Sequence, residues 1–321
     1  MSAQFEKESN ESGEFQRQED AFREWIGRST SYPATTGRYH LYVSLACPWA
    51  SRTLIVRNLK GLQDAIGLTI VDPVRDENGW AFRGPSEKWP PAQEFASTDP
   101  VSHFKYLREG YASTDPNFDE RVTVPVLWDK ETRKIVNNCE DDICVIFNDA
   151  FNEAAANKDV DLFPKDIADE HTKLSDFIYE NINNGVYRAG FATRQRPYEI
   201  SCAKVFEALD EMEKRLTASR YLFGNHIVEA DWRLFCTLVR FDVVYHGHFK
   251  CNLRRIIDYP KLQGYLVDLY QQPGIAETVN FDHIKRHYYM THEQINPTRI
   301  VPLGPIVDLA RPHGREKLSR A

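Results

Sequence analysis

The chain has 321 residues, 42% of them hydrophobic and 27% charged, so it can bury a sizeable core and is long enough for two domains of ordinary size. The chain has a net charge of -7 and so lacks the excess of basic residues that binds nucleic acids or anionic membranes. Neither partner is expected. No apolar run approaches the roughly 20 residues of a membrane span, and the N-terminal residues lack the apolar core of a signal peptide, so we expect a cytoplasmic protein.

Residues 1–37 are polar, with apolar side chains scattered among them. This composition predicts an N-terminal arm rather than a domain. The arm contains no motif to which a chemistry can be assigned.

A strand that runs into a helix is predicted around Cys47, in the sequence HLYVSLACPWASR. Leu41, Val43 and Leu45 alternate as in a half-buried strand. Pro48 suits the first helical turn, where its missing N–H would have had no partner. A cysteine at a helix N-terminus faces outward-pointing backbone N–H groups and the positive end of the helix dipole, which lowers the pKa of the thiol. Cys47 is therefore the candidate nucleophile.

The alternative for Cys47 is a packing role, because free cysteine is among the most buried residue types. The coincidence of strand, Cys-Pro step and helix favours the nucleophile. The six cysteines of the chain are too sparse for a disulfide framework and include no C-x-x-C pair, so all are expected to be reduced. Core packing is the default interpretation of Cys144, Cys202 and Cys236.

A thioredoxin-like domain is predicted over residues 38–157 by the order of its elements. A second short strand at 68–71 completes a right-handed βαβ crossover, and a hairpin and a helix follow. Val124-Pro125 interrupts the first hairpin strand, which predicts an edge position or a cis peptide bond. A segment rich in Pro, Gly and aromatic residues is inserted at about 73–120, and so long a stretch usually carries a function or short elements of its own.

Towards the C-terminus, apolar residues recur at the spacing of an α-helix, which predicts an all-helical domain over residues 165–295. Asp231 stands three residues after Val228, where its carboxylate can accept the Val228 N–H at the start of a helix. Four prolines predict an extended tail over residues 296–321. An apolar stripe at helical spacing is expected in the core: Val205, Leu209, Met212 and Leu216.

Four motifs carry a resemblance to a known family: Cys47-Pro-Trp-Ala, Val124-Pro125, Asn184-Gly-Val-Tyr-Arg-Ala-Gly-Phe-Ala, and His283-Ile-Lys-Arg-His-Tyr-Tyr with Ile295-Asn-Pro-Thr. Together they resemble the glutathionyl-hydroquinone reductases, or xi-class glutathione transferases. The resemblance covers about residues 20–315. Cys-Pro-Trp-Ala by itself also fits omega-like or lambda-like cysteine transferases, and the other motifs narrow the choice.

The resemblance implies a thioredoxin-like glutathione domain, an all-helical second domain and a homodimer. It also implies an enzyme that removes glutathione from S-glutathionyl-hydroquinones, with glutathione as co-substrate and a thioltransferase-type side activity. In that family the counterpart of Cys47 attacks the sulfur of the aromatic conjugate, which frees the hydroquinone and leaves a Cys–glutathione disulfide. A second glutathione then resolves this disulfide.

Further site residues are implied by position. Trp80 resembles the aromatic residue beside glutathione, Arg121 the cation near it, and Val124 the residue whose backbone pairs with the cysteinyl moiety. Tyr187 and Tyr288 resemble the hydroxyls that orient the quinol ring, since a tyrosine both stacks and donates a hydrogen bond. The structural alternatives are a core position for Trp80, a surface strand end for Arg121 and an ordinary strand position for Val124.

One departure from the family concerns the group that holds the γ-glutamyl moiety. Where the family has Asn-Asn-Glu-Ser, this chain has Asn-Asn-Cys139-Glu140-Asp141. Cys139 replaces the acid and Glu140 the hydroxyl, and a carboxylate that faces the glutathione carboxylate repels it. A shifted Glu140 or Asp141 can instead hold the ammonium group. The change leaves a second function open, a non-catalytic protein of the same fold that binds aromatic ligands and has weakened glutathione binding.

No further cofactor is expected from the motifs. His283 and His287 share one helix face, but no Glu lies between them as in H-E-x-x-H, so a metal site is not expected. The chain has no G-x-G-x-x-G after a strand and no G-x-x-x-x-G-K, so a nucleotide is not expected either.

Overall fold

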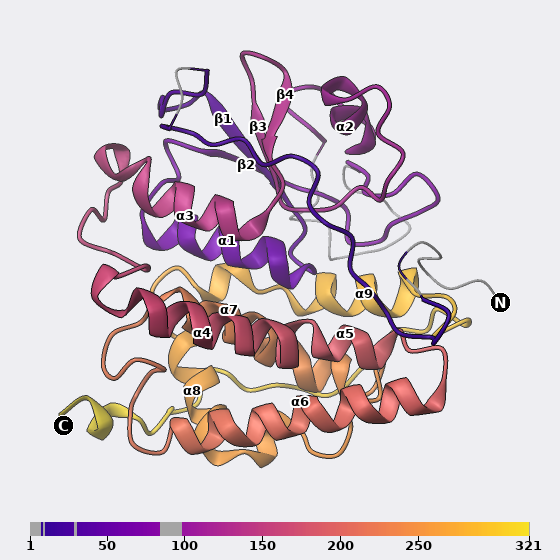
Figure 1. Cartoon of the computed structure of the whole chain (residues 1–321), viewed down its shortest axis with the longest axis vertical. Helices are drawn as coiled ribbons and strands as arrows, with labels where there is room; N and C mark the ends of the chain where they lie inside the picture. Colours follow the sequence, from indigo (N-terminus) through magenta and orange to yellow (C-terminus); the bar gives the residue numbers. More distant parts are fainter. Residues whose placement is uncertain (1–7, 9, 29–30, 84–97, 321) are drawn as a thin grey trace. The chain divides into compact units, whose positions relative to one another are not determined.

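The computed structural model describes residues 8, 10–28, 31–83 and 98–320, which fall into two compact units (Figure 1). The sheet unit consists of Glu19–Asp161 and Glu277–His287. The helical unit consists of Met1–Gln18, Leu162–Ala276 and Tyr288–Ala321. The domain limits expected from the sequence remain predictions.

The described part of the sheet unit contains four strands: β1 (Tyr39–Val43), β2 (Gly67–Ile70), β3 (Val126–Asp129) and β4 (Lys134–Asn137). They form one mixed sheet in the order β2-β1-β3-β4. β1 pairs in parallel with β2 and antiparallel with β3, and β3 pairs antiparallel with β4. The parallel pair confirms the predicted βαβ crossover, and the antiparallel pair of β3 and β4 confirms the predicted hairpin.

Two helices of the sheet unit, α1 (Pro48–Leu59) and α3 (Glu140–Asp149), pack side by side along the sheet (Figure 1). Both confirm predicted helices. Each starts directly after a cysteine with extended backbone, Cys47 before α1 and Cys139 before α3. β1 and β4 run in the same direction, because each is antiparallel to β3, so the two helices that follow them start at the same edge of the sheet.

All five residues of β1 are buried, which corrects the expectation of a half-buried strand. The reason is that both faces of the sheet are covered. One face packs on the helices, and the ring of Tyr39 lies 5.9 Å from that of Phe151, just after α3. On the other face, the ring of Phe82 lies 5.4 Å from that of Tyr42, within the aromatic segment that follows β2.

The inserted segment at about 73–120 carries short elements of its own, as expected. Its residues include α2 (Arg108–Thr114) and an antiparallel bridge between Ala81 and Tyr106. Residues 84–97 of this segment lie outside the described residues.

β3 lies in the middle of the sheet, which corrects one of the two expectations for the Val124-Pro125 step. The peptide bond between Val124 and Pro125 is cis, which confirms the other. β3 begins at Val126, so the proline stands just before the strand and removes no N–H from its hydrogen bonds. A central strand can therefore follow this proline directly.

The described part of the helical unit is built from α-helices, with π-helical turns that directly follow two of them (Figure 1). The α-helices are α4 (Ala168–Ile178), α5 (Gly185–Gly190), α6 (Gln195–Arg215), α7 (Glu229–Arg240) and α8 (Pro260–Tyr270), and α9 (Phe281–Thr291) spans the limit between the units. The π-helices are η5 (Tyr179–Asn183) and η6 (Phe241–Tyr245). Short 3-10 helices are η3 (Asn152–Ala154) of the sheet unit, η4 (Lys165–Ile167), η7 (Ile256–Asp258), η8 (Ala276–Thr278) and η9 (Glu316–Arg320).

The core of the helical unit contains the predicted apolar stripe. Asp231 at the start of α7 confirms the predicted cap, because its carboxylate accepts the Val228 N–H at 2.9 Å. It also accepts the Leu222 N–H at 2.9 Å and the Tyr265 hydroxyl at 2.7 Å. The stripe residues are all fully buried: Val205, Leu209, Met212 and Leu216.

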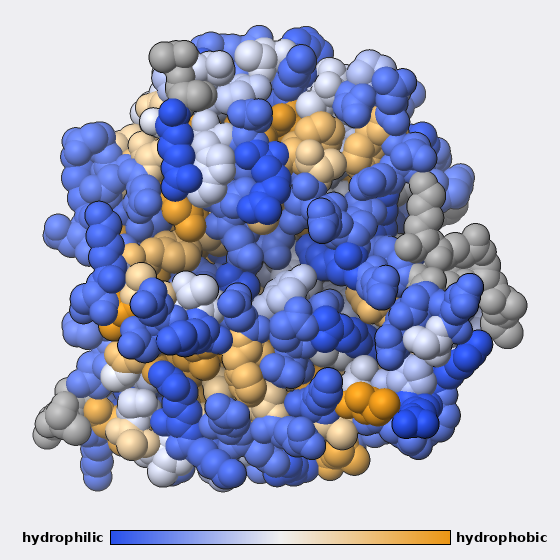
Figure 2. Space-filling view, in the orientation of Figure 1, coloured by the Kyte–Doolittle hydropathy of each residue, from blue (hydrophilic) through white to orange (hydrophobic). Residues whose placement is uncertain are grey.

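The surface agrees with the high share of charged residues in the chain. On the face drawn in Figure 2, hydrophilic residues predominate and hydrophobic residues form small separate patches. Within the stretches that the structure describes, no helix combines the length and the apolar character needed to cross a bilayer.

Candidate active site

Cys47 occupies the N-cap of α1, with an extended backbone at φ -78° and ψ 121°. Its carbonyl oxygen accepts the Ser51 N–H at 3.0 Å, which is the first hydrogen bond of the helix. The side chain is half-buried, whereas all the other cysteines are buried. A helix N-terminus favours the thiolate over the thiol, so the location supports the predicted nucleophile. The pKa of Cys47 remains a prediction.

The sulfur of Cys47 lies 3.6 Å from the carbonyl oxygen of Val124, the residue before the cis proline. A neutral thiol donates a weak hydrogen bond to such an oxygen. Two predicted site residues, 77 positions apart in the chain, therefore meet in the sheet unit. Arg121 is half-buried in the connection that leads to Val124. Its role toward a ligand stays a prediction.

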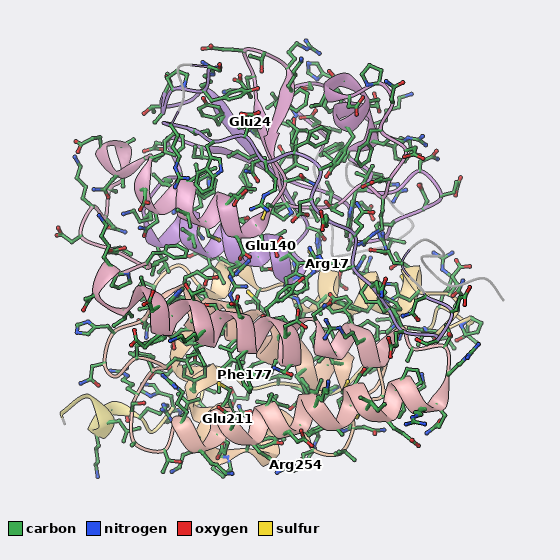
Figure 3. The ribbon with its side chains drawn as sticks, viewed as in Figure 1. Arg17, Glu24, Glu140, Phe177, Glu211 and Arg254 are labelled. Atoms are coloured by element: carbon green, nitrogen blue, oxygen red, sulfur yellow. The ribbon has the colours of Figure 1, made fainter. Side chains whose placement is uncertain are left out.

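Arg52 of α1 joins the predicted acidic residues at the start of α3. Its guanidinium lies 2.5 Å from Asp141 Oδ1 and 3.5 Å from Glu140 Oε1. The side chains of Arg52 and Glu140 are almost completely buried, whereas that of Asp141 is half exposed. Figure 3 labels Glu140 at the N-terminal turn of α3. The guanidinium offsets one of the two negative charges, so a ligand would meet a smaller repulsion than the sequence suggested.

Cys139, which stands where the family has an acid, is buried at the N-cap of α3. Burial, together with the carboxylate of Glu140, raises the pKa of the Cys139 thiol to about 12. The thiol therefore stays neutral near pH 7 and cannot supply the negative charge of the acid that it replaces.

Trp80 is buried and stacks on His287, with ring centroids 4.9 Å apart and planes inclined by 19°. The guanidinium of Arg75 lies 5.3 Å from the centre of the Trp80 ring. His287 Nδ1 lies 2.8 Å from the carbonyl oxygen of Pro73 and can donate to it. Trp80 is thus part of the packing of the sheet unit, and its place beside glutathione remains a prediction.

Tyr187 and Tyr288 meet in the helical unit, where their hydroxyl oxygens lie 2.5 Å apart. The hydroxyl oxygen of Tyr245 lies 2.9 Å from that of Tyr288. The three hydroxyls form a chain with Tyr288 in the middle. Tyr187 is half-buried, whereas Tyr245 and Tyr288 are buried, so Tyr187 is the outward end of the chain.

Burial raises the pKa of Tyr245 and of Tyr288 well above the ordinary value. Both side chains are therefore neutral phenols near pH 7, and each can donate one hydrogen bond while accepting another. If Tyr245 donates to Tyr288 and Tyr288 donates to Tyr187, the Tyr187 hydroxyl stands at the end of the chain as a donor. The inner hydroxyl can thus orient the outer one.

Two π-helical turns place these tyrosines. η5 directly precedes α5, which carries Tyr187, and η6 ends at Tyr245. The last residue of η5, Asn183, donates to the Arg233 carbonyl at 2.9 Å and to the Thr237 hydroxyl at 2.7 Å, which holds η5 on α7. A π-turn adds a residue to the helical repeat and turns the side chains that follow it, which is why π-turns are frequent at functional sites.

The sequence motifs pointed to neither Arg52 nor Tyr245. A signal for Arg52 was its charge among apolar residues of the predicted helix, five positions after Cys47. Tyr245 offered no signal, because it is one of 15 tyrosines and belongs to none of the motifs.

The chain matches two family models. Residues 46–149 match the model described as glutathione S-transferase, N-terminal domain. Residues 191–267 match the model described as glutathione S-transferase, C-terminal domain. The first span includes Cys47 and Val124, and the second includes Tyr245.

Two relatives are similar to the chain over nearly their whole length. Glutathionyl-hydroquinone reductase YqjG from Escherichia coli (strain K12) is 49% identical over 313 residues, which are 95% of this chain and 93% of YqjG. Glutathionyl-hydroquinone reductase PcpF from Sphingobium chlorophenolicum is 44% identical over 293 residues, which are 91% of this chain and 90% of PcpF.

Two solved structures are similar as well. The glutathione-S-transferase Xi from Phanerochaete chrysosporium superimposes with a TM-score of 0.89 at 46% identity, covering 93% of this chain and 95% of that one. The glutathione-bound structure of YqjG from Escherichia coli K-12 superimposes with a TM-score of 0.86 at 48% identity, covering 92% of this chain and 96% of that one.

Proposed function

Because the chain belongs to the glutathione transferase family, in the xi class of glutathionyl-hydroquinone reductases, we propose that it removes glutathione from S-glutathionyl-hydroquinones through Cys47. Glutathione is the co-substrate, and aromatic conjugates are the substrates. One observation carries the role of Cys47: a half-buried thiol stands at a helix N-terminus, with its sulfur 3.6 Å from the Val124 carbonyl oxygen.

The reaction proceeds in two steps. In the first, the Cys47 thiolate attacks the sulfur of the glutathionyl group, a disulfide bond forms, and the bond from that sulfur to the ring carbon breaks. The ring carbon takes a proton, and free hydroquinone leaves. In the second, a glutathione thiolate attacks the mixed disulfide and restores the Cys47 thiolate. One glutathionyl-hydroquinone and one glutathione thus give one hydroquinone and one glutathione disulfide.

The residues of the sheet unit hold the glutathionyl group. The Val124 backbone pairs with the cysteinyl moiety. When the ligand binds, the Val124 carbonyl oxygen accepts an N–H of the ligand in place of the Cys47 thiol. Trp80 contacts the ligand beside it, and Arg121 supplies a positive charge. Asp141, which is half exposed but already paired with Arg52, holds the γ-glutamyl ammonium only weakly, because the family's acid is replaced by Cys139.

The Tyr187 hydroxyl donates a hydrogen bond to an oxygen of the quinol ring, and Tyr288 orients that hydroxyl. Tyr187→Phe therefore lowers kcat for a glutathionyl-hydroquinone by about a hundredfold, the scale of a positioned proton donor. Tyr245→Phe lowers kcat only severalfold, because Tyr245 acts through Tyr288. Steady-state kinetics of both variants measures the effects. Equal losses in the two variants would exclude this order of the hydroxyls.

The altered glutathione anchor gives a second prediction. Cys139→Glu combined with Glu140→Ser restores the family's acid and hydroxyl, and we expect about tenfold tighter binding of glutathione. The physical reason is that the neutral Cys139 thiol makes no charge-assisted hydrogen bond with the ammonium group. Titration calorimetry with glutathione measures the dissociation constants.

Glu140→Gln serves as the matched control, because it removes the same negative charge without restoring the acid at position 139. It is expected to gain less affinity than the double variant. Unchanged affinity in the double variant would show that Asp141 or Glu140 already supplies the contact with the ammonium group. The non-catalytic alternative would then lose its main support.

The function itself is tested with purified protein, glutathione and a glutathionyl-hydroquinone. Chromatography is expected to show free hydroquinone and glutathione disulfide in equal amounts. A protein that binds the conjugate but releases neither product would support the second function, a non-catalytic ligand-binding member of the same fold.

We also propose that the protein is a homodimer, as the family resemblance implies, and that it is cytoplasmic, as the composition of its sequence led us to expect. Sedimentation equilibrium of the purified protein is expected to give twice the mass of one chain. Cell fractionation is expected to recover the protein with cytoplasmic markers. The mass of a single chain at micromolar concentration would contradict the dimer.

A further inference from the structure

Two cysteines of the helical unit, Cys202 and Cys251, lie apart from the residues assigned above. Cys202 lies on α6, and Cys251 lies in the loop after η6. The Cys202 sulfur lies 4.0 Å from the carbonyl oxygen of Lys250, the residue that directly precedes Cys251. Tyr198, one helical turn before Cys202, donates its hydroxyl to the same Lys250 carbonyl at 2.7 Å. The loop is thus held on α6, with Cys251 next to the carbonyl group that Cys202 contacts.

We propose that Cys202 and Cys251 are a redox modification site that forms an intramolecular disulfide when the protein meets hydrogen peroxide. The Cys202 thiolate attacks the peroxide, the O–O bond breaks, and a sulfenic acid and one water form after a proton is taken up. The Cys251 thiol then attacks that sulfur, the disulfide bond forms, and the hydroxyl leaves as a second water. The peroxide gains two electrons, and the two thiols lose them.

The surroundings assign different roles to the two sulfurs. The neighbouring Cys251 thiol lowers the pKa of Cys202 to about 7. The Cys202 thiol and burial raise the pKa of Cys251 well above the ordinary value. Cys202 is therefore the attacking thiolate, and Cys251 is the thiol that resolves the sulfenic acid.

Access to the pair is narrow. Cys202 is 5% exposed and Cys251 is fully buried, whereas the neighbouring Lys250 and Asn252 are exposed. Hydrogen peroxide is little larger than water, so a small opening of the loop would admit it, whereas glutathione disulfide would need a much larger one. The oxidant of this site therefore differs from the disulfide that reacts with Cys47.

The same loop connects the pair to the tyrosines. Cys251 N–H donates to the Tyr245 carbonyl at 3.0 Å, and the ring of Phe249 stacks on Tyr245 with centroids 5.5 Å apart. Phe249 also packs against Tyr187, with centroids 5.4 Å apart. A disulfide holds its two sulfurs at bonding distance, so oxidation pulls the loop toward α6 and shifts the Phe249 ring. A shift of Phe249 disturbs the neighbouring tyrosines and thereby lowers activity. This effect on activity rests on the proposed function, whereas the disulfide itself does not.

Mass spectrometry of peroxide-treated protein tests the site in the Cys47→Ser background, where the most exposed thiol is absent. After alkylation and digestion without reductant, we expect a cross-linked peptide pair that contains Cys202 and Cys251 and disappears with dithiothreitol. Cys236→Ala, which removes another buried thiol of the same unit, is expected to keep the cross-link. Recovery of Cys202 and Cys251 as separate alkylated or sulfinic peptides would overturn the proposal.

Activity measurements test the link to the tyrosines. Wild-type protein and Cys251→Ala are treated briefly with peroxide and then assayed in excess glutathione, which restores Cys47 in both. Wild type is expected to lose activity severalfold more than Cys251→Ala, and dithiothreitol is expected to remove the difference. Equal residual activities would refute the effect on the tyrosines, and an inactive untreated enzyme would refute the proposed function instead.

Discussion

Cys47→Ser lowers hydroquinone release to below about a thousandth of the wild-type rate, while the protein stays folded. A serine hydroxyl is far less acidic than a thiol and forms no disulfide with glutathione, so the covalent intermediate is lost. The other cysteines do not replace Cys47, because all of them are buried. Steady-state assays with a glutathionyl-hydroquinone and circular dichroism of the variant measure the two parts of this expectation.

Mass spectrometry gives a second readout for Cys47. After treatment with glutathione disulfide, wild-type protein is expected to carry one glutathione adduct, located on Cys47, and Cys47→Ser is expected to carry none. Cys236→Ala, the matched control for loss of a thiol, is expected to keep both adduct and activity. Wild-type turnover in Cys47→Ser, or an adduct on another cysteine, would show that the nucleophile is misassigned.

Asp231→Ala has the largest expected effect on stability, a loss of roughly 3–5 kcal/mol in the free energy of unfolding. The Asp231 carboxylate accepts the N–H groups of Leu222 and Val228 and the hydroxyl of Tyr265, all of them buried. Alanine leaves these donors without their acceptor inside the helical unit, and each costs about 1–3 kcal/mol. Urea unfolding followed by circular dichroism measures the loss.

Asp258→Ala is the matched control for Asp231→Ala. Asp258 also accepts a backbone N–H three residues before it, that of Arg255 at 2.9 Å, but it lies at the protein surface. Water can satisfy the released N–H there, so the loss of stability is expected to be much smaller. Equal losses in the two variants would mean that burial of the Asp231 network contributes nothing.

The stability that Asp231 contributes depends on pH with a definite sign. Burial raises its pKa from 3.8 to about 6, so the folded protein holds the Asp231 proton more tightly than the unfolded chain does. The proton-linked stabilisation is therefore fully present below the unfolded pKa and is lost as the pH rises through about 6. The difference in unfolding free energy between wild type and Asp231→Ala is expected to grow on acidification from about pH 7 to about pH 4. A constant difference would contradict the raised pKa.

The sequence by itself determined those features whose signals lie within a few neighbouring residues. The junction at Cys47 follows from a strand pattern, a proline suited to the first helical turn and an apolar helix. The β3–β4 hairpin and the Asp231 cap are local in the same way, because backbone sterics and short-range hydrogen bonds set such features. At Val124-Pro125 the sequence left an edge strand and a cis bond open, and the structure decided for the cis bond.

Only the tertiary structure decided the features that depend on residues far apart in the chain. β1 is buried on both faces because a distant aromatic segment covers the face that alternation would leave to water. Arg52 meets Asp141 only because α1 and α3 pack together, and Tyr245 meets Tyr288 only through the packing of the helical unit. No local pattern encodes these pairs, since long-range packing, and not sequence spacing, sets which buried polar groups find each other.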